Sequence, residues 1–356
     1  MRTPIAIVGG GPAGCAAALT LRRYLPNLSV TLVTRPPPSV AEVPAVGETL
    51  SPGVLPLLDY IGLREQFQEL GHLPSGGTTS AWGSEHLLER NYLFTGRGHG
   101  WHLDRSRFDA WLLSKAQEAG ARCIRSRVIR AIRSEGVWRI GLEGGGDLVA
   151  NVIVEATGRS KGLLGDHGSV MRRDDGLVAE ARWFWHGRDE ASADGALVES
   201  IPDGWWYSAS LPGGHGVAMF MTDTDLRRQN SWDNRLAAAP ATTARLGSWQ
   251  PMKQTVVRPA NSQCSPVVVG EGWVAAGDTA AAFDPISALG IGFALRSGME
   301  AARVAVSYLE DDDALSTAYA ASVVRIYADY RARLRGIYEL EKRWPDSPFW
   351  ARRHGR

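Results

Sequence analysis

The chain of 356 residues has few cysteines and no strong excess of charge of either sign. Its three cysteines, Cys15, Cys123 and Cys264, lie far apart and lack the spacing of metal ligands. An odd number of cysteines suits a reducing compartment. The formal net charge is only +1, so a basic nucleic-acid surface is not indicated. We therefore expect a cytoplasmic protein with no bound metal and no nucleic-acid partner.

Long apolar runs are also scarce, and the one candidate lies near the N-terminus. Residues 4–21 contain no charged side chain, so length alone would permit a signal peptide or a membrane span. Four glycines and two prolines interrupt this run. A buried strand, a glycine turn and a helix explain the same stretch better, and we expect no membrane association.

The remaining pattern is typical of an α/β protein. Residues 4–34 have the pattern of a βαβ unit, with a helix rich in small residues between two apolar strands. Residues 166–260 are mostly strand-like, and residues 272–309 return to a strand–loop–helix pattern. Helical patterns cover residues 52–71, 106–121, 225–246 and 314–344.

The turn of the βαβ unit carries the glycine pattern of a dinucleotide-binding fold, in the sequence VGGGPAG. Gly9 allows a tight turn, Gly11 lets the backbone approach a pyrophosphate, and Gly14 allows close packing of the helix. Pro12 and Ala13 open that helix, whose free N–H groups favour a bound anion. We therefore expect these five residues to bind a dinucleotide.

The second strand lacks the acidic residue that often binds the adenosine ribose in such folds. It ends instead in Thr34 and Arg35. An arginine at this position can favour the 2′-phosphate of NADP, and it can equally cover the adenine or a phosphate of FAD. The first glycine motif leaves these cofactors unresolved.

A second motif, GDTAAAFDPISALGIGFAL, begins at Gly277. Asp278 follows a predicted strand and is placed to accept a ribose or ribitol hydroxyl group. The loop from Ser287 to Gly292 leads into a helix N-terminus, which would stabilise negative charge on a reduced ring. The alternative is an ordinary turn and helix cap.

Four segments together give the chain a family resemblance: VGGGPAG at the start, DRSRFDAWL at 104–112, VEATGRS at 154–160, and the second glycine motif. They resemble the flavoprotein monooxygenases of the p-hydroxybenzoate hydroxylase fold. The narrower likeness is to the branch with flavin-dependent halogenases, geranylgeranyl-type reductases and flavoproteins that modify tryptophan during cofactor maturation.

The resemblance implies FAD as the cofactor and a role for several residues. Arg105 and Asp278 would contact the FAD chain, and Ala156 and Gly158 would lie near the dinucleotide. The residues expected beside the isoalloxazine are Pro285, Gly290 and Ile291. For Arg105 the alternative is a surface charge ahead of a helix.

The expected fold is α/β with an α+β substrate part. A discontinuous, Rossmann-like FAD-binding domain would comprise residues 1–73, 101–165 and 262–310. An interleaved β-sheet substrate domain would comprise residues 74–100 and 166–261, and residues 311–356 would form a C-terminal helical segment.

Two departures disfavour halogenase activity. Halogenases carry a Trp-x-Trp-x-Ile-Pro element, whereas this chain has Trp205-Trp206-Tyr207 followed by Leu211-Pro212. They also need a lysine that holds hypohalous acid, expected in or near residues 72–84, and no lysine precedes Lys115. We retain Trp206 as a candidate catalytic residue of the substrate domain.

The segments SAWGS and GWHLDR and the C-terminal residues resemble flavoproteins that hydroxylate tryptophan in partner proteins during quinone-cofactor biogenesis. The resemblance implies an FAD-dependent monooxygenase that transfers oxygen from a flavin hydroperoxide to an electron-rich aromatic substrate, either a small molecule or a tryptophan in a protein or peptide. Only one dinucleotide fingerprint is present, so electrons come from transiently bound NAD(P)H or from a partner flavin reductase.

Three alternatives to hydroxylation stay open. The first is an FAD-dependent reductase or dehydrogenase of a small molecule. The second is a flavin-binding escort without catalytic activity, and the third is an NADP-only dehydrogenase that uses Arg35.

Glu48 is the remaining candidate, in the loop VGET ahead of a predicted helix. The resemblance implies a Gly-Glu loop near the flavin, where the acid would order the loop or handle protons. The alternative is a carboxylate that stabilises a helix N-terminus. Glu48, Pro285 and Trp206 are the predicted catalytic residues, and Glu48 is also a predicted cofactor contact.

Overall fold

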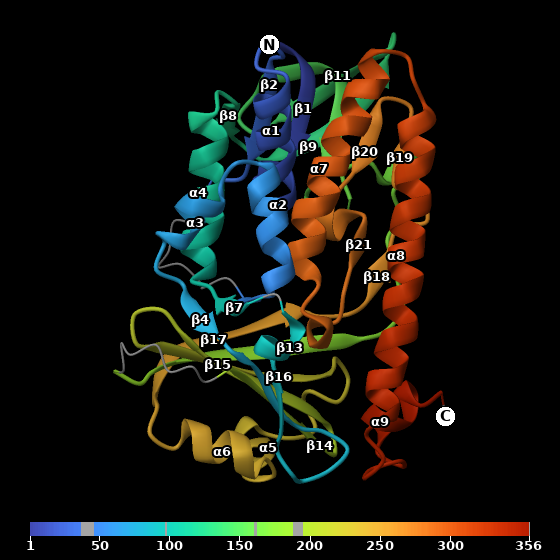
Figure 1. Ribbon diagram of the computed structural model, residues 1–356. Coiled ribbons are helices and arrows are strands. Elements are labelled where there is room, and N and C mark those ends of the chain that lie inside the picture. The colour runs from blue at the N-terminus through green and yellow to red at the C-terminus, as the bar shows by residue number, and fades with distance from the viewer. Residues whose placement is uncertain (37–45, 97, 160–161, 188–194, 356) are drawn as a thin grey trace.

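A computed structural model describes the chain apart from residues 37–45, 97, 160–161, 188–194 and 356 (Figure 1). It is a mixed α/β structure with one sheet near each end, and the chain passes between the two sheets several times. Secondary structure in the described ranges follows the sequence patterns closely, with differences in where the helices break.

The first sheet has the order β19-β20-β11-β1-β2-β8, and the hairpin of β9 and β10 extends from β11. Strands β1, β2, β8, β11 and β20 pair in parallel. Their carboxyl ends therefore meet at one edge, where α/β folds bind ligands. The bounds are β1 Arg2–Val8, β2 Val30–Thr34, β8 Arg122–Arg125, β9 Val128–Ser134, β10 Val137–Leu142, β11 Asp147–Glu155, β19 Val269–Gly270 and β20 Trp273–Ala275.

Two helices on this sheet, α1 (Pro12–Tyr24) and α7 (Gly290–Leu309), pack tightly against each other. A Cβ atom on Gly298 would lie 2.2 Å from the carbonyl oxygen of Ala13, and one on Gly277 would lie 2.8 Å from the Cβ of Ala13. The small residues are thus required for the close approach. Helix α4 (Arg105–Glu118) packs beside α1.

The second sheet has the order β17-β13-β16-β15-β14-β5-β6 and is antiparallel except where β14 pairs with β5. Its outer face is covered by α5 (Trp232–Ala237) and α6 (Pro240–Leu246), which break the helix predicted for 225–246 in two. The strands are β5 Gly77–Ala81, β6 Leu88–Asn91, β13 Leu177–Trp185, β14 Ala196–Ile201, β15 Gly204–Leu211, β16 His215–Asp223 and β17 Gln250–Pro259.

Two small sheets join the larger ones. One has the order β3-β7-β4, and the other has the order β12-β18-β21. Their strands are β3 Thr49–Leu50, β4 Leu73–Ser75, β7 Gly100–His102, β12 Arg172–Arg173, β18 Gln263–Cys264 and β21 Ala281–Ala282. The helix predicted for 52–71 is a 3₁₀ turn (Pro52–Val54) followed by α2 (Leu55–Tyr60) and α3 (Arg64–Gln68). Further 3₁₀ turns are Tyr92–Thr95, Gly165–His167, Gly277–Thr279 and Pro285–Ser287.

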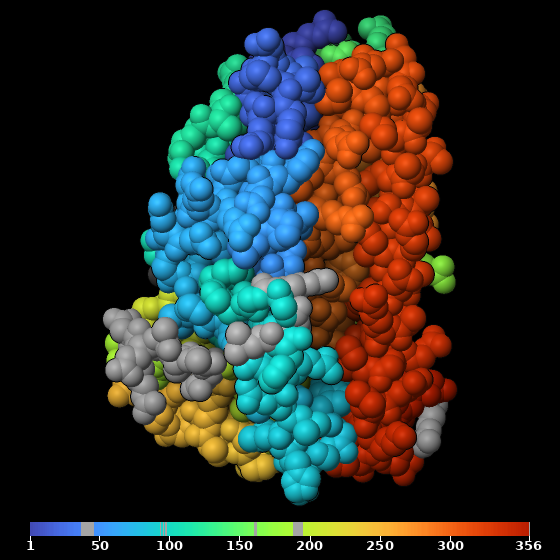
Figure 2. Space-filling view, viewed as in Figure 1, coloured from blue at the N-terminus to red at the C-terminus, as the bar shows by residue number. Residues whose placement is uncertain are grey.

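Helix α8 (Ala314–Glu339) runs from the first sheet to the second, and α9 (Pro348–Arg353) follows it. Figure 2 shows α8 in red beside α7 in orange, with α2 in light blue on the other side of α7. Within the described ranges, no helix combines the length and apolarity needed to cross a membrane. The proposed domain boundaries stay a prediction, although strands of the two large sheets alternate along the chain.

Candidate functional site

The glycine turn between β1 and α1 is tightly packed at Gly9 and Gly14 and open at Gly11. A Cβ atom on Gly9, whose φ is +119°, would lie 2.0 Å from the carbonyl oxygen of Ala156. A Cβ atom on Gly14 would lie 1.8 Å from the carbonyl oxygen of Gly9. No described atom lies within 4 Å of a Cβ placed on Gly11. The turn therefore leaves room for a pyrophosphate beside Gly11, and FAD fits this observation.

Helix α1 offers its N-terminus to the same space. Gly11 is the residue before the helix, Pro12 occupies its first turn, and that turn carries no acidic residue. The free N–H groups and the positive end of the helix dipole favour a bound anion. Arg35, the candidate adenosine contact, is exposed just after β2. Its contact with the cofactor stays a prediction.

The second motif places Asp278 in the 3₁₀ turn after β20, where an arginine that the sequence analysis missed accompanies it. The Arg159 Nε atom lies 3.0 Å from the Asp278 carboxylate and pairs with it. Arg159 also donates to the carbonyl oxygens of Asn261, at 2.6 Å, and Phe283, at 2.8 Å. The backbone N–H of Gly158 donates to Thr279 Oγ1 at 2.9 Å. Arg159 follows directly after the predicted element ATG, which was the available signal.

The predicted flavin-side loop begins at Pro285, which is exposed in the 3₁₀ turn Pro285–Ser287. Ala288 has a positive φ of +50°, and Gly290 is exposed at the start of α7. Ile291 is buried one residue later. The loop thus presents backbone near a helix N-terminus, while Asp284 holds its beginning by accepting the N–H of Ile286 at 2.9 Å.

Glu48 is almost completely buried, with 1% of its surface exposed. Neither carboxylate oxygen has a hydrogen-bond partner among the described residues. Burial raises the pKa of Glu48 to about 7, although its own amide, the Arg105 charge and the amide of Gly47 act in the opposite direction. Glu48 lies just before β3, and its carbonyl oxygen accepts the N–H of Leu103. This placement does not support the helix-capping alternative.

Arg105 anchors the loop that carries Glu48. One Nη atom donates to the carbonyl oxygens of Val46 and Gly47, at 3.2 and 2.9 Å, and the other pairs with Asp109 at 3.1 Å. The Nε atom of Arg105 is buried and has no partner in the described part of the chain. The side chain is therefore no free surface charge. Its direct contact with FAD stays a prediction.

A tyrosine that the sequence analysis did not select faces the Glu48 loop from the second sheet. The Tyr207 and Thr49 hydroxyl groups lie 2.7 Å apart and share a hydrogen bond. Burial first, and then the nearby charge of Glu48, raise the pKa of Tyr207. His102 pairs with Thr49 across β7 and β3, and burial lowers its pKa to about 4. Glu48, Tyr207 and neutral His102 therefore gather where β3 and β7 meet β15.

Trp206, in contrast, lies on the opposite face of β15. It is fully buried and packs against Trp232 and Phe220, with ring centroids 4.5 and 5.0 Å apart. These partners belong to the small core beneath α5 and α6. Because adjacent strand residues point to opposite faces, Trp206 does not join Glu48 and Tyr207. We therefore leave Trp206 out of the proposed site, and its catalytic role stays an untested prediction.

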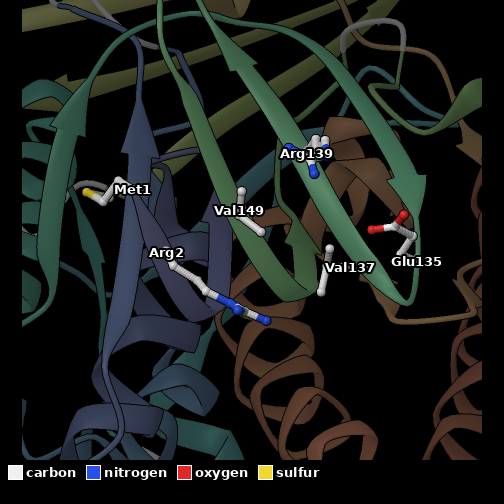
Figure 3. A pocket seen from close by; sticks show the side chains of 6 residues that line it. All are labelled: Met1, Arg2, Glu135, Val137, Arg139 and Val149. Atoms are coloured by element: carbon white, nitrogen blue, oxygen red, sulfur yellow. The ribbon is translucent and has the colours of Figure 1, made fainter.

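A surface hollow of about 570 Å³ lies away from this region (Figure 3). It is lined by Met1, Arg2, Glu135, Val137, Arg139 and Val149. Met1 and Arg2 lie at the amino end of β1, opposite the edge that carries Gly9, so this hollow is not the dinucleotide site. No cluster of His, Cys, Asp or Glu suited to a metal ion occurs in the described ranges.

Comparison with protein families gives two matches. Residues 2–137 match the family model described as FAD binding domain. Residues 84–355 match the family model described as tryptophan halogenase, which covers well over half of the chain.

Relatives of known name extend over almost the whole chain. LodB of Marinomonas mediterranea, named as an FAD-dependent oxidoreductase, is 33% identical over 98% of this chain and 96% of its own length. A tryptophan 2-halogenase of Chondromyces crocatus is 26% identical over 98% of this chain and 70% of its own length.

Two solved structures have the fold of this chain over almost its whole length. The peptidyl tryptophan dihydroxylase QhpG is 26% identical, with a TM-score of 0.76 over 99% of this chain and 79% of that one. The myxobacterial chondrochloren halogenase CndH is 20% identical, with a TM-score of 0.86 over 99% of this chain and 86% of that one, which shows a shared fold. The chain therefore belongs to the tryptophan halogenase family and is a flavin-dependent oxidoreductase with an FAD-binding domain.

Proposed function

We propose that this chain is an FAD-dependent monooxygenase that hydroxylates an electron-rich aromatic ring, with a tryptophan or indole in a partner protein or peptide as its substrate. The observation that carries the proposal is the composition of residues 72–84. All of them are described, and none is the lysine that halogenation requires. The similarity to QhpG, whose name specifies a peptidyl tryptophan dihydroxylase, supports the same choice of reaction and substrate.

The residues of the first sheet fit the cofactor. Bound FAD would supply the redox and oxygen-activating chemistry. The space beside Gly11 and the N-terminus of α1 would hold the pyrophosphate, and Asp278 with Arg159 would hold the chain beyond it. The exposed backbone at Pro285 and Gly290 would lie against the ring. These assignments follow the order in which the motifs meet the carboxyl edge of the sheet.

Glu48 is the candidate for proton handling. A carboxyl group with a pKa of about 7 holds or releases a proton near neutral pH, which suits a general acid or base. Its unpartnered oxygens are free to engage a group that arrives with the cofactor or the substrate. Arg105 fixes the backbone of its loop, and the Tyr207–Thr49 hydrogen bond fixes the strand that follows. The surrounding burial excludes water from the reaction.

Product analysis tests the proposal. Reduced holoprotein is mixed with oxygen, bromide and chloride, and with free tryptophan, indole or tryptophan-bearing peptides, and the products are analysed by mass spectrometry. We expect the mass of added oxygen on a tryptophan ring. A halogen mass would establish the halogenase alternative, which the family match over 84–355 favours. A gain of two hydrogens without oxygen would establish a reductase.

The electron source needs a separate measurement. NADH and NADPH are added anaerobically to the holoprotein, with and without a purified flavin reductase, and the loss of flavin absorbance is followed. Because the chain carries a single dinucleotide fingerprint, we expect fast reduction only when the reductase is present. Fast reduction by either nucleotide alone would show that the nicotinamide binds directly to this enzyme.

A further inference from the structure

Helix α8 carries tyrosines at positions 319, 327, 330 and 338. With 3.6 residues per turn, these spacings place all four on one side of the helix. Tyr319, Tyr330 and Tyr338 are buried. Since α8 runs from the first sheet to the second, these four tyrosines are spaced along the region between the two sheets.

The first two buried tyrosines contact the cofactor side only. The Tyr319 hydroxyl donates to the carbonyl oxygen of Ala275, in β20, at 2.6 Å. The Tyr330 hydroxyl accepts the backbone N–H of Asp284 at 2.7 Å and shares a second hydrogen bond with Ser262, also at 2.7 Å. Tyr330 therefore contacts the start of the predicted flavin-side loop, whereas Tyr319 binds a strand away from it.

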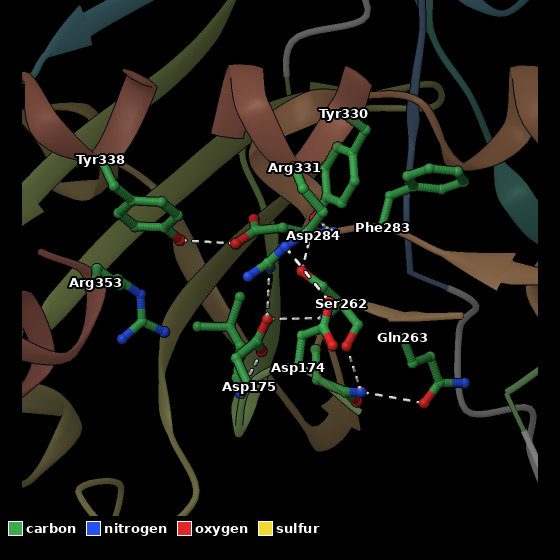
Figure 4. Close-up of polar contacts among 12 residues, drawn as sticks. Asp174, Asp175, Ser262, Gln263, Phe283, Asp284, Tyr330, Arg331, Tyr338 and Arg353 are labelled. Atoms are coloured by element: carbon green, nitrogen blue, oxygen red, sulfur yellow. Dashed lines mark hydrogen bonds and ion pairs between the residues drawn. The ribbon is translucent and has the colours of Figure 1, made fainter. Parts of the chain in front are cut away.

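The Tyr338 hydroxyl contacts both sides. It donates to Asp284 Oδ2 at 2.7 Å, as Figure 4 shows, and it accepts the indole N–H of Trp205 at 3.1 Å. Because the indole nitrogen is only a donor, the hydroxyl proton of Tyr338 is left for the Asp284 carboxylate. Asp284 directly precedes Pro285, and Trp205 lies in β15 two residues before Tyr207. One hydroxyl group thus joins the loop to the second sheet.

This junction is buried, yet it borders a cavity of about 490 Å³ that Asp284, Tyr338, Arg331 and Arg353 help to line. Burial raises the pKa of Asp284 to about 6, while the Ile286 N–H and the Tyr338 hydroxyl act in the opposite direction. The other charges that act on Asp284 are those of Asp175, which raises its pKa, and Arg353, which lowers it.

We propose that Tyr338 is a positioning residue, whose hydroxyl group holds the loop at 285–290 in a fixed position relative to the substrate-side sheet through Asp284 and Trp205. The consequence for turnover rests on the proposed monooxygenase function. The link that Tyr338 makes between this loop and the second sheet depends only on the fold, and it can be measured with FAD bound and no substrate present. A loop held in this way keeps the reacting ring and the substrate aligned, and a small misplacement wastes oxygen without forming product.

The test compares three variants that each lose one hydroxyl group and keep the aromatic ring. Tyr338→Phe removes the contacts to the loop and to the sheet, Tyr330→Phe removes a contact to the loop, and Tyr319→Phe serves as the matched control. The measurements are FAD affinity, the visible flavin spectrum, and the ratio of product formed to oxygen consumed. We expect Tyr338→Phe to keep FAD binding within about threefold and to lower the product-to-oxygen ratio about tenfold.

The pH dependence adds a readout that a merely structural role would not change. Loss of the Tyr338 donor raises the pKa of Asp284, so the acid limb of the flavin spectrum and of turnover should move to higher pH in Tyr338→Phe. Tyr319→Phe should leave the limb and the product-to-oxygen ratio unchanged. Trp205→Phe removes the sheet-side hydrogen bond together with part of a buried ring that packs against Trp82, and it leaves the Tyr338–Asp284 contact in place. It should lower the ratio without moving the limb.

The outcomes separate the two proposals. If the wild-type enzyme hydroxylates no substrate, the proposed function fails. The pH dependence of the flavin spectrum in Tyr338→Phe still tests whether Tyr338 couples the loop at 285–290 to the second sheet. If Tyr338→Phe matches Tyr319→Phe in spectrum, acid limb and product-to-oxygen ratio, the positioning role is wrong. If Tyr338→Phe does not fold, Trp205→Phe decides, and an unchanged product-to-oxygen ratio in that variant overturns the inference.

Discussion

The two large sheets differ in how a residue's position along the chain relates to its place in the fold. In the first sheet, parallel strands bring every following loop to the same edge, so Gly9 after β1 and Asp278 after β20 lie at the carboxyl edge where we propose that FAD binds. In the mostly antiparallel second sheet, the place of a residue in the fold depends instead on the face of the strand to which it points. Trp206 and Tyr207 are neighbours, yet one lies in a closed core and the other reaches Thr49. In the first sheet, a sequence motif is enough to predict at which edge a residue lies. In the second sheet, the strand pairing must also be known before the face of a residue can be given.

The largest combined effect, on stability and on FAD binding together, is expected at the glycine turn of the first sheet. In Gly9→Ala the new methyl group would meet the carbonyl oxygen of Ala156, in a backbone conformation that alanine rarely adopts. We expect a loss of about 3 kcal/mol in the free energy of unfolding, together with loss of FAD. Denaturant unfolding and flavin absorbance measure both. Normal FAD binding would show that the turn is less constrained than the contact with Ala156 implies.

Substitutions on the two faces of β15 come next and test the second sheet. Trp206→Ala should cost about 3–5 kcal/mol of stability because it leaves a large cavity in the core, but the surviving folded protein should keep its product-to-oxygen ratio. Tyr207→Phe should cost only about 1 kcal/mol and should slow hydroxylation. Chemical unfolding and product analysis check the pair. The reverse pattern would return Trp206 to the site.

Glu48→Gln tests the acid between the sheets and is expected to keep FAD bound while slowing turnover. Because the pKa of Glu48 rises from 4.5 to about 7, the native state binds more protons than the unfolded state in that window. The wild-type protein therefore loses stability as pH rises through it, and the variant does not. We expect the stability of Glu48→Gln relative to wild type to increase by about 1–3 kcal/mol from pH 5 to pH 8.

Equilibrium unfolding of both proteins at several pH values isolates the contribution of Glu48 to the pH dependence of stability. Burial lowers the pKa of His72 and His102 to about 4, which makes stability rise with pH between about 4 and 6.5 in both proteins. Their contribution cancels in the difference. A difference that does not vary with pH would mean that Glu48 is ionised in the native state, and unchanged turnover would remove it from the proposed reaction.

The smallest effect on stability is expected for Gly11→Ala, at a position only two residues after Gly9. Its new methyl group would meet no described atom, and alanine before α1 costs less than about 1 kcal/mol. The same group would occupy the space proposed for the pyrophosphate. We therefore expect FAD affinity to fall while the apoprotein unfolds almost as wild type does, as measured by titration and denaturant unfolding. Unchanged affinity would place the pyrophosphate elsewhere.

Much of the cofactor side could be predicted from the sequence because its signals are local. The glycine turn has the expected strand before it and the expected helix after it, and Asp278 follows a strand as predicted. Arg159 was missed although it follows Gly158 directly. Its pairing with Asp278 joins positions that are 119 residues apart, and no local spacing reveals such a contact.

The substrate side was predicted less well for the same reason. Trp206 was retained as a candidate and Tyr207 was not selected, because the sequence could not say which face of β15 meets Thr49. Glu48 was selected as an unusual acid in a loop, and its burial and unpartnered oxygens depend on Arg105 and on β7, which lie far along the chain. Its catalytic role stays a proposal.

By itself, the sequence of this protein determined the dinucleotide turn, the helices that flank it and membership of an FAD-dependent family, because these features depend on neighbouring residues and on periodicity. Only the tertiary structure decided which acid is buried without a partner, which face of β15 approaches the loop that carries Glu48, and how Tyr338 joins Asp284 to Trp205. Those outcomes come from strand pairing and helix packing between distant segments, where the burial of one group depends on which others cover it.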